Sequence, residues 1–207
     1  MEAGQHAAAQ GRYGDAERIF SAAVTKAEQF GAEDRRVAQA LSSLAQAYAV
    51  QNKHAEAEPA YLRALKIYQA VHGEMHPDVA ATLNNLGVLY RRHGQYADAE
   101  PLLVRAVAIK ENVFGPEHLE LAVTLKNLAQ LYATQGQFAK AEPLLRRIVS
   151  IRERAQGSMH PDVARSLDDR AMLLRQMGRE KEAEPLELRS QAILTGAPPP
   201  DRKPAPR

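Results

Sequence analysis

The sequence predicts an all-α fold, a solenoid built from antiparallel helix hairpins. Landmark residues recur at intervals of 42 positions, and each half of this repeat carries an apolar stripe of helical period. No run alternates in the way a β-strand does, and only 5% of the residues are aromatic, which argues against a sandwich or barrel. One hairpin cannot bury its stripe alone, so neighbouring hairpins must stack.

The first half of each repeat is predicted to be one helix. In the second copy, Val79, Leu83, Leu86 and Tyr90 form its apolar stripe, and Gly87 is the small residue at which a partner helix can approach closely. A Pro-Asp pair opens this helix in two copies, which suits a helix N-terminus. The leading stripe position is occupied in the four copies by Val37, Val79, Leu121 and Val163.

The second half of each repeat is predicted to be a second helix, reached through a turn. The turn residue is Asn52, Gly94, Gly136 or Gly178, and the tripeptide Ala-Glu-Pro follows in every copy. Its proline lies near the helix start, where a missing N–H costs least. The glutamate recurs in every repeat, which indicates a structural position, because a catalytic pair is needed only once. These glutamates are Glu58, Glu100, Glu142 and Glu184.

The domain prediction is a single solenoid over residues 1–194 with a tail over 195–207. The solenoid comprises a partial repeat 1–36 and the repeats 37–78, 79–120, 121–162 and 163–194. The partial repeat consists of a second helix over residues 12–29 and a short partner, which leaves open whether the natural chain starts before Met1. In the last repeat Arg170 replaces a core Leu and Leu174 replaces a Tyr, as expected of a polar terminal cap. The tail holds five of the twelve prolines and is predicted to be disordered.

Composition excludes several classes of function. The chain has no Cys, so it has no disulfide, thiolate metal site or Cys nucleophile. The net charge of +2 comes from the tail, so a basic face for nucleic acid is not expected. No apolar stretch suits membrane insertion, and no secretory signal is visible. The chain as given would be cytoplasmic, or secreted or periplasmic if an upstream signal was removed.

The repeat resembles a known family. The segment LNNLGVLYRRHGQYADAEPLLVRAVAIKENVFG, with its HPDVA-type link, resembles the tetratricopeptide repeat, and in particular the 42-residue variant of kinesin light chains and many bacterial proteins. The resemblance extends from Gly4 to Leu194. It implies a right-handed superhelix whose first helices line a concave groove that binds partner segments. No heptad segment precedes the repeats, which argues against kinesin light chain itself.

The helical wheel of the first helices indicates the same face. Successive side chains of a helix are rotated by about 100° around its axis, so a second set of side chains lies opposite the buried apolar stripe. The family resemblance assigns Asn85 and Asn127 to a peptide backbone, which an amide side chain suits because it donates and accepts. The basic members favour an acidic, extended segment, although Asp168 and Asp169 oppose this at one end. The candidate groove residues are Ser43, Gln46, Asn84, Asn85, Val88, Arg91, Arg92, Lys126, Asn127, Gln130, Arg165 and Asp169.

One specialised mode of binding is not expected. The chaperone-binding class of the family holds a C-terminal carboxylate with a clamp that includes an asparagine after the small residue. This chain has Gln46, Val88, Gln130 and Met172 at those positions. A co-chaperone role is therefore disfavoured.

Metal binding and catalysis are not expected either. His76, His118 and His160 occur once per repeat, too far apart to share an ion, and are interpreted as helix-start residues. His72 lies four positions before His76, but Gly73 stands between them. The sequence contains no phosphate-binding Gly loop, no HExxH and no Ser, His and Asp arrangement. No cofactor is expected, and the protein is predicted to be no enzyme.

The leading functional hypothesis is a non-enzymatic scaffold that binds a peptide segment of a partner protein. One alternative is a self-assembly module, because the short first helix was expected to leave apolar surface at Ile19, Phe20 and Val24 for a second copy. Another is a regulatory domain of a larger enzyme or complex.

Overall fold

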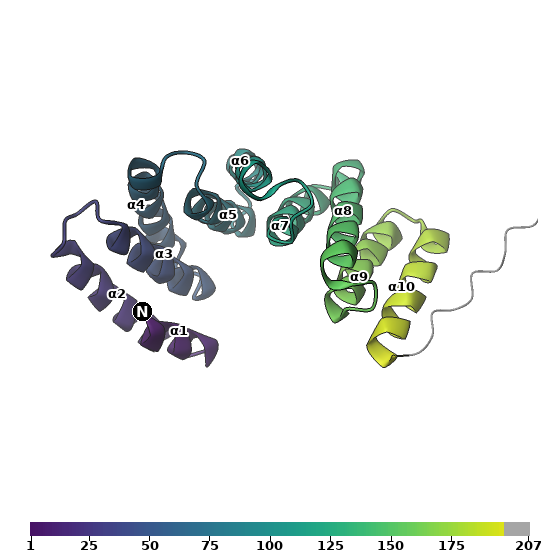
Figure 1. Cartoon of the computed structure of the whole chain (residues 1–207), viewed down its shortest axis with the longest axis horizontal. Helices are drawn as coiled ribbons and strands as arrows, with labels where there is room; N and C mark the ends of the chain where they lie inside the picture. Colours follow the sequence, from purple (N-terminus) through teal and green to yellow (C-terminus); the bar gives the residue numbers. More distant parts are fainter. Residues whose placement is uncertain (197–207) are drawn as a thin grey trace, which may run out of the picture. The chain divides into compact units, whose positions relative to one another are not determined.

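The computed structural model describes residues 1–196, and these form ten α-helices in succession along the chain (Figure 1). No strand occurs in this described range. The helices are α1 (Glu2–Ala9), α2 (Tyr13–Glu28), α3 (Arg35–Val50), α4 (His54–His72), α5 (Pro77–Arg92), α6 (Tyr96–Phe114), α7 (Leu121–Thr134), α8 (Phe138–Gln156), α9 (Pro161–Gln176) and α10 (Glu180–Thr195).

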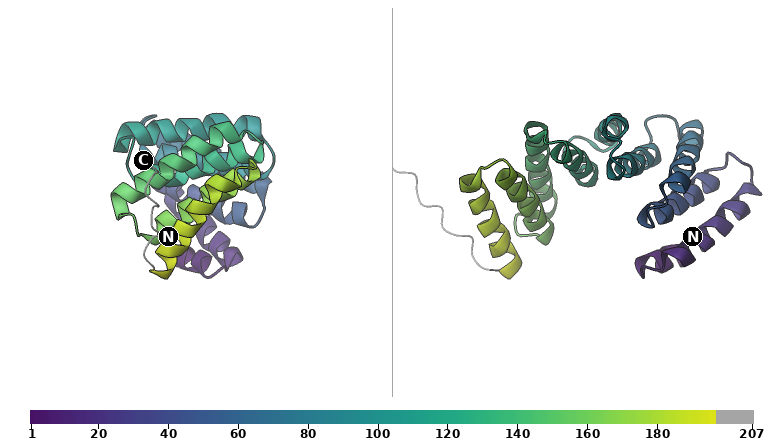
Figure 2. Two further views of the ribbon diagram at one scale, coloured as in Figure 1. Left: turned by 90° about the vertical axis from the view of Figure 1, so that its right-hand side faces the viewer. Right: turned by 180° about the vertical axis from the view of Figure 1, so that it is seen from behind.

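The helices pack as successive antiparallel hairpins. Helix α1 packs on α2, α3 on α4, α7 on α8 and α9 on α10 (Figure 2), and consecutive hairpins also contact each other through α2 with α3, α4 with α5 and α8 with α9. The chain divides into two compact units, unit 1 over Met1–Val113 and unit 2 over Phe114–Arg207. The all-α prediction is confirmed, whereas the division into one solenoid over residues 1–194 stays a prediction.

The helix boundaries follow from local sequence. Pro77 and Pro161 are the first residues of α5 and α9, as expected for a ring that fixes φ and lacks an N–H. Helix α7 begins two residues later in the repeat, at Leu121, and Leu119 and Glu120 stand where the links before α5 and α9 have Pro-Asp. Asn52 adopts a φ of 59° at the turn where other hairpins place a glycine, and Asn is the residue that tolerates this conformation best after glycine.

A small residue permits the close contact between α5 and α6. A Cβ added to Gly87 would lie 2.7 Å from Leu103 Cγ and 3.3 Å from the carbonyl oxygen of Ala99. Gly87 is therefore the position at which α5 and α6 approach, as its place in the repeat predicted. Leu83 and Leu103, on either side of this contact, are fully buried.

The expectation of exposed apolar surface at the first hairpin is wrong. Phe20 and Val24 are buried and Ile19 is half-buried, because the eight residues of α1 lie against α2. Gly4 makes this possible, since a Cβ there would lie 2.5 Å from the Phe20 ring. A short helix thus suffices to cover the stripe of α2.

The interpretation of Arg170 as part of a polar outer cap is also wrong. Its Nε and Nη2 donate to Glu142 Oε1 at 3.2 and 2.9 Å, so the side chain turns inward onto α8. Its side chain is 21% exposed and that of Glu142 12%. At the chain's end, Thr195 closes α10 and Gly196 follows it, while the rest of the predicted tail, residues 197–207, lies outside the described residues.

Candidate functional site

In unit 1 a cavity lies beside α3, next to the candidate face. The cavity has a volume of about 350 Å³, and two of the predicted groove residues, Ser43 and Gln46, line it. Apolar side chains of α1, α2 and the end of α3 line the cavity together with the polar side chains of α3. Its lining residues are Gln5, Ala8, Tyr13, Phe20, Ser43, Gln46, Ala47 and Val50.

On α5 the side chains of the candidate residues differ in how exposed they are to a ligand. Asn85 and Val88 are half-buried at the surface. Asn84 is only 8% exposed, and its Nδ2 donates to Asn85 Oδ1 at 3.3 Å. Asn84 therefore orients the side chain of Asn85 by this hydrogen bond, and its own amide is not exposed to a ligand.

The end of α5 carries two adjacent arginines. Arg91 is half-buried, its Nε is buried without a hydrogen-bond partner, and burial together with the charge of Arg92 lowers the pKa of its guanidinium. Arg92 is exposed and donates through Nη2 to Asn52 Oδ1 at 3.0 Å. The observed contacts leave both positive charges unbalanced by a carboxylate, which would favour an acidic group nearby.

In unit 2 the candidate face is a cavity among α7, α8 and α9. Its volume is about 130 Å³, and three predicted groove residues, Lys126, Gln130 and Asp169, line it. Lys126 Nζ donates to Asp169 Oδ2 at 2.5 Å, which ties α7 to α9. The remaining lining residues are Ala129, Ala133, Leu145, Met172, Leu173 and Gln176.

The basic residues of unit 2 have carboxylate partners. Lys126 pairs with Asp169, and Arg165 pairs with Asp162, whose pKa is lowered first by the hydrogen bond from Arg165 and then by that from Gln156. Asn127 lies half-buried on the same helix as Lys126. These ion pairs reduce the attraction of unit 2 for an acidic ligand. From the sequence, that attraction is attributed in part to Lys126 and Arg165.

The predicted groove residues therefore separate into two groups. Ser43, Gln46, Asn84, Asn85, Val88, Arg91 and Arg92 belong to unit 1, and Lys126, Asn127, Gln130, Arg165 and Asp169 belong to unit 2. The list of candidates includes the apolar Val88 but omits two apolar side chains that the helical wheel also places opposite the buried stripe. These are Met172 on α9 and Val123 on α7, which are 63% and 60% exposed.

Two of the recurring histidines, His76 and His160, cap helix starts as interpreted, whereas His118 lies in the link before α7. His76 Nδ1 accepts the backbone N–H of Asp78 at 3.1 Å, and His160 Nδ1 accepts that of Asp162 at 3.1 Å. His118 Nδ1 accepts the N–H of Glu120 at 3.2 Å in the link between α6 and α7. The rings of His76 and His160 therefore each satisfy one of the free N–H groups of a helix N-terminus, whereas the N–H that His118 accepts precedes α7.

The comparison with known proteins decides the family. The model of the tetratricopeptide repeat matches four overlapping segments, residues 1–70, 37–112, 78–154 and 134–195. The chain belongs to the tetratricopeptide repeat family. Among curated proteins, no sequence matches this chain.

Solved structures show the same tetratricopeptide repeat fold. BtubC (BKLC) from P. vanneervenii superposes with a TM-score of 0.83 at 23% identity, over 99% of this chain and 83% of its own. A putative kinesin light chain from Podosopora anserina with nearly identical TPR-like repeats gives 0.80 at 24% identity, over 94% and 93%. Aspartyl phosphate phosphatase F from Bacillus subtilis gives 0.78 at 17% identity, over 93% of this chain and 49% of its own.

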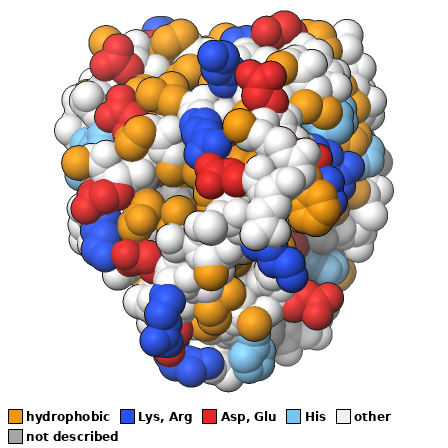
Figure 3. Space-filling model, turned by 90° about the vertical axis from the view of Figure 1, so that its left-hand side faces the viewer, with side chains coloured by type: hydrophobic (Ala, Val, Ile, Leu, Met, Phe, Trp, Pro, Cys, Tyr) orange, Lys and Arg blue, Asp and Glu red, His pale blue; other side chains and the backbone are white. Residues whose placement is uncertain are grey.

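The repeat fold is that of protein–protein interaction scaffolds, and such scaffolds are typically non-enzymatic. On the face drawn in Figure 3, acidic and basic side chains lie beside one another among apolar ones. Within residues 1–196, no helix combines the length and the apolar character needed to cross a membrane.

Proposed function

We propose that this tetratricopeptide repeat protein binds an extended segment of a partner protein on the exposed face of its first helices, without catalysing a reaction. The candidate binding surfaces are two, one in each unit: the face of α3 and α5 in unit 1 and the face of α7 and α9 in unit 2. The observation that carries the proposal is the position of the two cavities. Each is lined by residues of the candidate face, Ser43 and Gln46 in one and Lys126, Gln130 and Asp169 in the other.

The chemistry of these cavities suits a peptide. Amide side chains can both donate to and accept from a peptide backbone, whatever its sequence. Met172 adds an adaptable apolar side chain at the rim of the unit 2 cavity. It is more exposed than the apolar side chains of the second helices, such as Leu62 at 45% and Val104 at 44%. A face that combines exposed apolar groups with amides is an interaction surface.

The charges favour an acidic residue in the part of the segment that reaches α5. Arg91 and Arg92 lack carboxylate partners in their observed contacts, and bringing a carboxylate to them would offset the cost of holding two like charges together. The ion pairs of Lys126 and Arg165 predict no such preference in unit 2.

Selection from a random peptide display library, followed by fluorescence anisotropy with a labelled selected peptide, tests the proposal. Gln46→Glu and Met172→Glu change the faces of units 1 and 2, and Leu62→Glu is the matched control on a second helix. We expect at least one face variant to weaken binding by on the order of tenfold, while the control binds as wild type does.

Circular dichroism establishes that every variant is folded before binding is compared. Equal binding by wild type and both face variants would move the site away from the first helices. An equal loss in the Leu62→Glu control would show that the change in charge, and not the face, matters. Failure of the library to yield any binding peptide would argue against peptide recognition itself.

A further inference from the structure

The link between α4 and α5 brings together three side chains that carry metal-binding atoms. His72 is the last residue of α4, His76 caps α5 and Asp78 lies in the first turn of α5, all within unit 1. One ligand atom from each lies within 4.8 Å of the other two. The glycine that separates the histidines in sequence allows the chain to turn so that the rings stack, with centroids 4.0 Å apart.

The carboxylate of Asp78 is not hydrogen-bonded to either histidine ring of the cluster. Asp78 Oδ2 lies 3.7 Å from His72 Nε2 and 3.6 Å from His76 Nδ1, too far for a hydrogen bond to either ring. His72 Nε2 is buried and has no hydrogen-bond partner. A buried polar atom without a partner is costly, and here it faces a carboxylate, so a bound cation would satisfy both.

We propose that His72, His76 and Asp78 bind a divalent transition-metal ion, zinc in the first instance, that joins the end of α4 to the start of α5. Two imidazole nitrogens and one carboxylate oxygen are a ligand set that zinc accepts, with water in the fourth position. Zinc bonds of about 2.0–2.1 Å in tetrahedral geometry separate ligand atoms by about 3.3–3.4 Å. The observed 3.6 and 3.7 Å are close to this separation, and the two rings must turn out of their near-parallel stacking for both lone pairs to reach one ion.

Zinc would take the Nδ1 lone pair of His76 that now accepts the N–H of Asp78. The released N–H lies at a helix N-terminus, and the His76 side chain is 35% exposed, so water can replace the ring as its acceptor. The cap is thus a competing interaction of modest strength, and it does not block the site.

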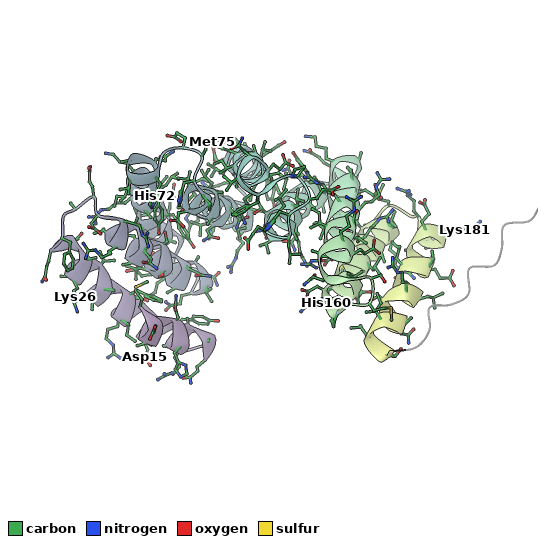
Figure 4. All side chains as sticks on the ribbon, viewed as in Figure 1. Asp15, Lys26, His72, Met75, His160 and Lys181 are labelled. Atoms are coloured by element: carbon green, nitrogen blue, oxygen red, sulfur yellow. The ribbon has the colours of Figure 1, made fainter. Side chains whose placement is uncertain are left out.

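The other links of the chain provide internal controls. His160 caps α9 in the same way as His76 caps α5, and Asp162 corresponds to Asp78. The position of His72, however, is occupied there by Gln156, which donates to Asp162 Oδ2 at 3.2 Å. In the link after α6, Phe114 stacks on His118 at the same position. Only in the α4–α5 link, among the described residues, is this position a second histidine, His72. Figure 4 labels His72 and, in the α8–α9 link, His160.

Titration of the metal-free chain with Zn²⁺ alone, followed by isothermal titration calorimetry, tests the site. His76→Asn removes a ligand but keeps a residue that caps helices well, and His160→Asn makes the same change in a link without a second histidine. His72→Phe places at the site the residue that position 114 already carries. We expect wild type and His160→Asn to bind one equivalent, and His76→Asn and His72→Phe to bind at least ~10-fold more weakly.

Two further measurements separate ligation from a change in folding. Zn²⁺ should raise the midpoint of thermal unfolding of wild type and His160→Asn only, because binding to the folded state alone stabilises it. Co²⁺ should give visible absorption bands with wild type that His72→Phe lacks. Unchanged zinc binding in both His72→Phe and His76→Asn, or no binding by wild type, would overturn the proposal.

Discussion

At the residue scale, single atoms decide how closely helices approach and which polar groups are satisfied. Gly87 lets α6 approach α5, because a side chain there would collide with Leu103. Tyr90 donates from its hydroxyl to Glu58 Oε1 at 2.7 Å, so the glutamate of the recurring Ala-Glu-Pro tripeptide accepts from the next hairpin. Both positions were recognisable as repeat landmarks, and the structure gives each a physical role.

Gly87→Ala should destabilise the fold. The added Cβ would lie 2.7 Å from Leu103 Cγ, and overpacking of this kind costs about 1–3 kcal/mol, against about 1 kcal/mol gained from helix propensity. Urea denaturation followed by circular dichroism measures the difference. Gly14→Ala in α2 is the matched control, since its Cβ meets nothing within 4 Å, and it should be neutral or slightly stabilising. Equal effects of the two changes would contradict this account of Gly87.

The raised pKa of Tyr90 predicts a loss of folding stability at alkaline pH. Burial, with the hydrogen bond to Glu58 as a second cause, raises the pKa of Tyr90 to about 12, whereas an unfolded tyrosine titrates near about 10. The folded chain therefore retains this proton while the unfolded chain loses it, so the stabilisation is complete below about pH 10 and is lost toward about pH 12.

Tyr90→Phe should remove part of this dependence and cost about 1 kcal/mol near neutral pH, because Glu58 loses its donor. The unfolding free energies of wild type and variant, measured at about pH 8 and about pH 11, give both quantities. Burial also raises the pKa of Tyr61 and Tyr68, so a residual slope is expected. An identical slope in wild type and variant would exclude Tyr90 as its source.

At the element scale, two departures from the repeat in α9 compensate for each other. Leu174 stands where Tyr90 stands in α5, so Glu142 has no tyrosine hydroxyl to accept from. Arg170, one turn earlier, replaces a core leucine and supplies two N–H donors to Glu142. The two substitutions preserve one interaction between neighbouring hairpins by different chemistry.

Arg170→Leu should therefore destabilise unit 2 although it restores the usual core residue. Glu142 would keep only Arg146 at 3.5 Å, an exposed partner, and leaving a largely buried carboxylate short of donors costs about 1–3 kcal/mol. The double variant Arg170→Leu with Leu174→Tyr recreates the pair seen between α4 and α5 and should recover most of the loss. Chemical denaturation of the three proteins measures this, and an absence of rescue would refute the compensation.

The sequence predicts helices and their contacts better than it predicts side-chain pairs. The 42-residue register located the hairpins and the close approach at Gly87, because these follow from local period and residue size. It did not reveal the pair of Lys126 with Asp169, 43 positions apart, or the stacking of His72 on His76. Both depend on the rotation of side chains about neighbouring helices, which residue type and spacing do not specify. The accessible face was predictable, whereas the burial of Asn84 within it was not.

At the scale of the whole molecule, two compact units with internal packing predict local responses to mutation. Within each unit consecutive hairpins contact each other, α2 with α3 and α4 with α5 in unit 1 and α8 with α9 in unit 2. Arg170→Leu should therefore speed amide hydrogen exchange in α8, α9 and α10 and leave α1 to α3 unchanged. Exchange detected by mass spectrometry resolves these segments. Equal acceleration throughout the chain would show that the molecule unfolds as one cooperative body.

The glutamate contact gives the repeat array a direction. In the α4–α5 and α8–α9 pairs, the acceptor lies on the earlier hairpin and the donor on the later one. A hairpin exchanged for another therefore keeps this contact if its leading helix carries a tyrosine or an arginine in the matching place. Glu184, which is exposed, occupies the same repeat position as Glu58 and Glu142. In an engineered longer array, its carboxylate could accept a hydrogen bond from a tyrosine or an arginine on the first helix of an added hairpin.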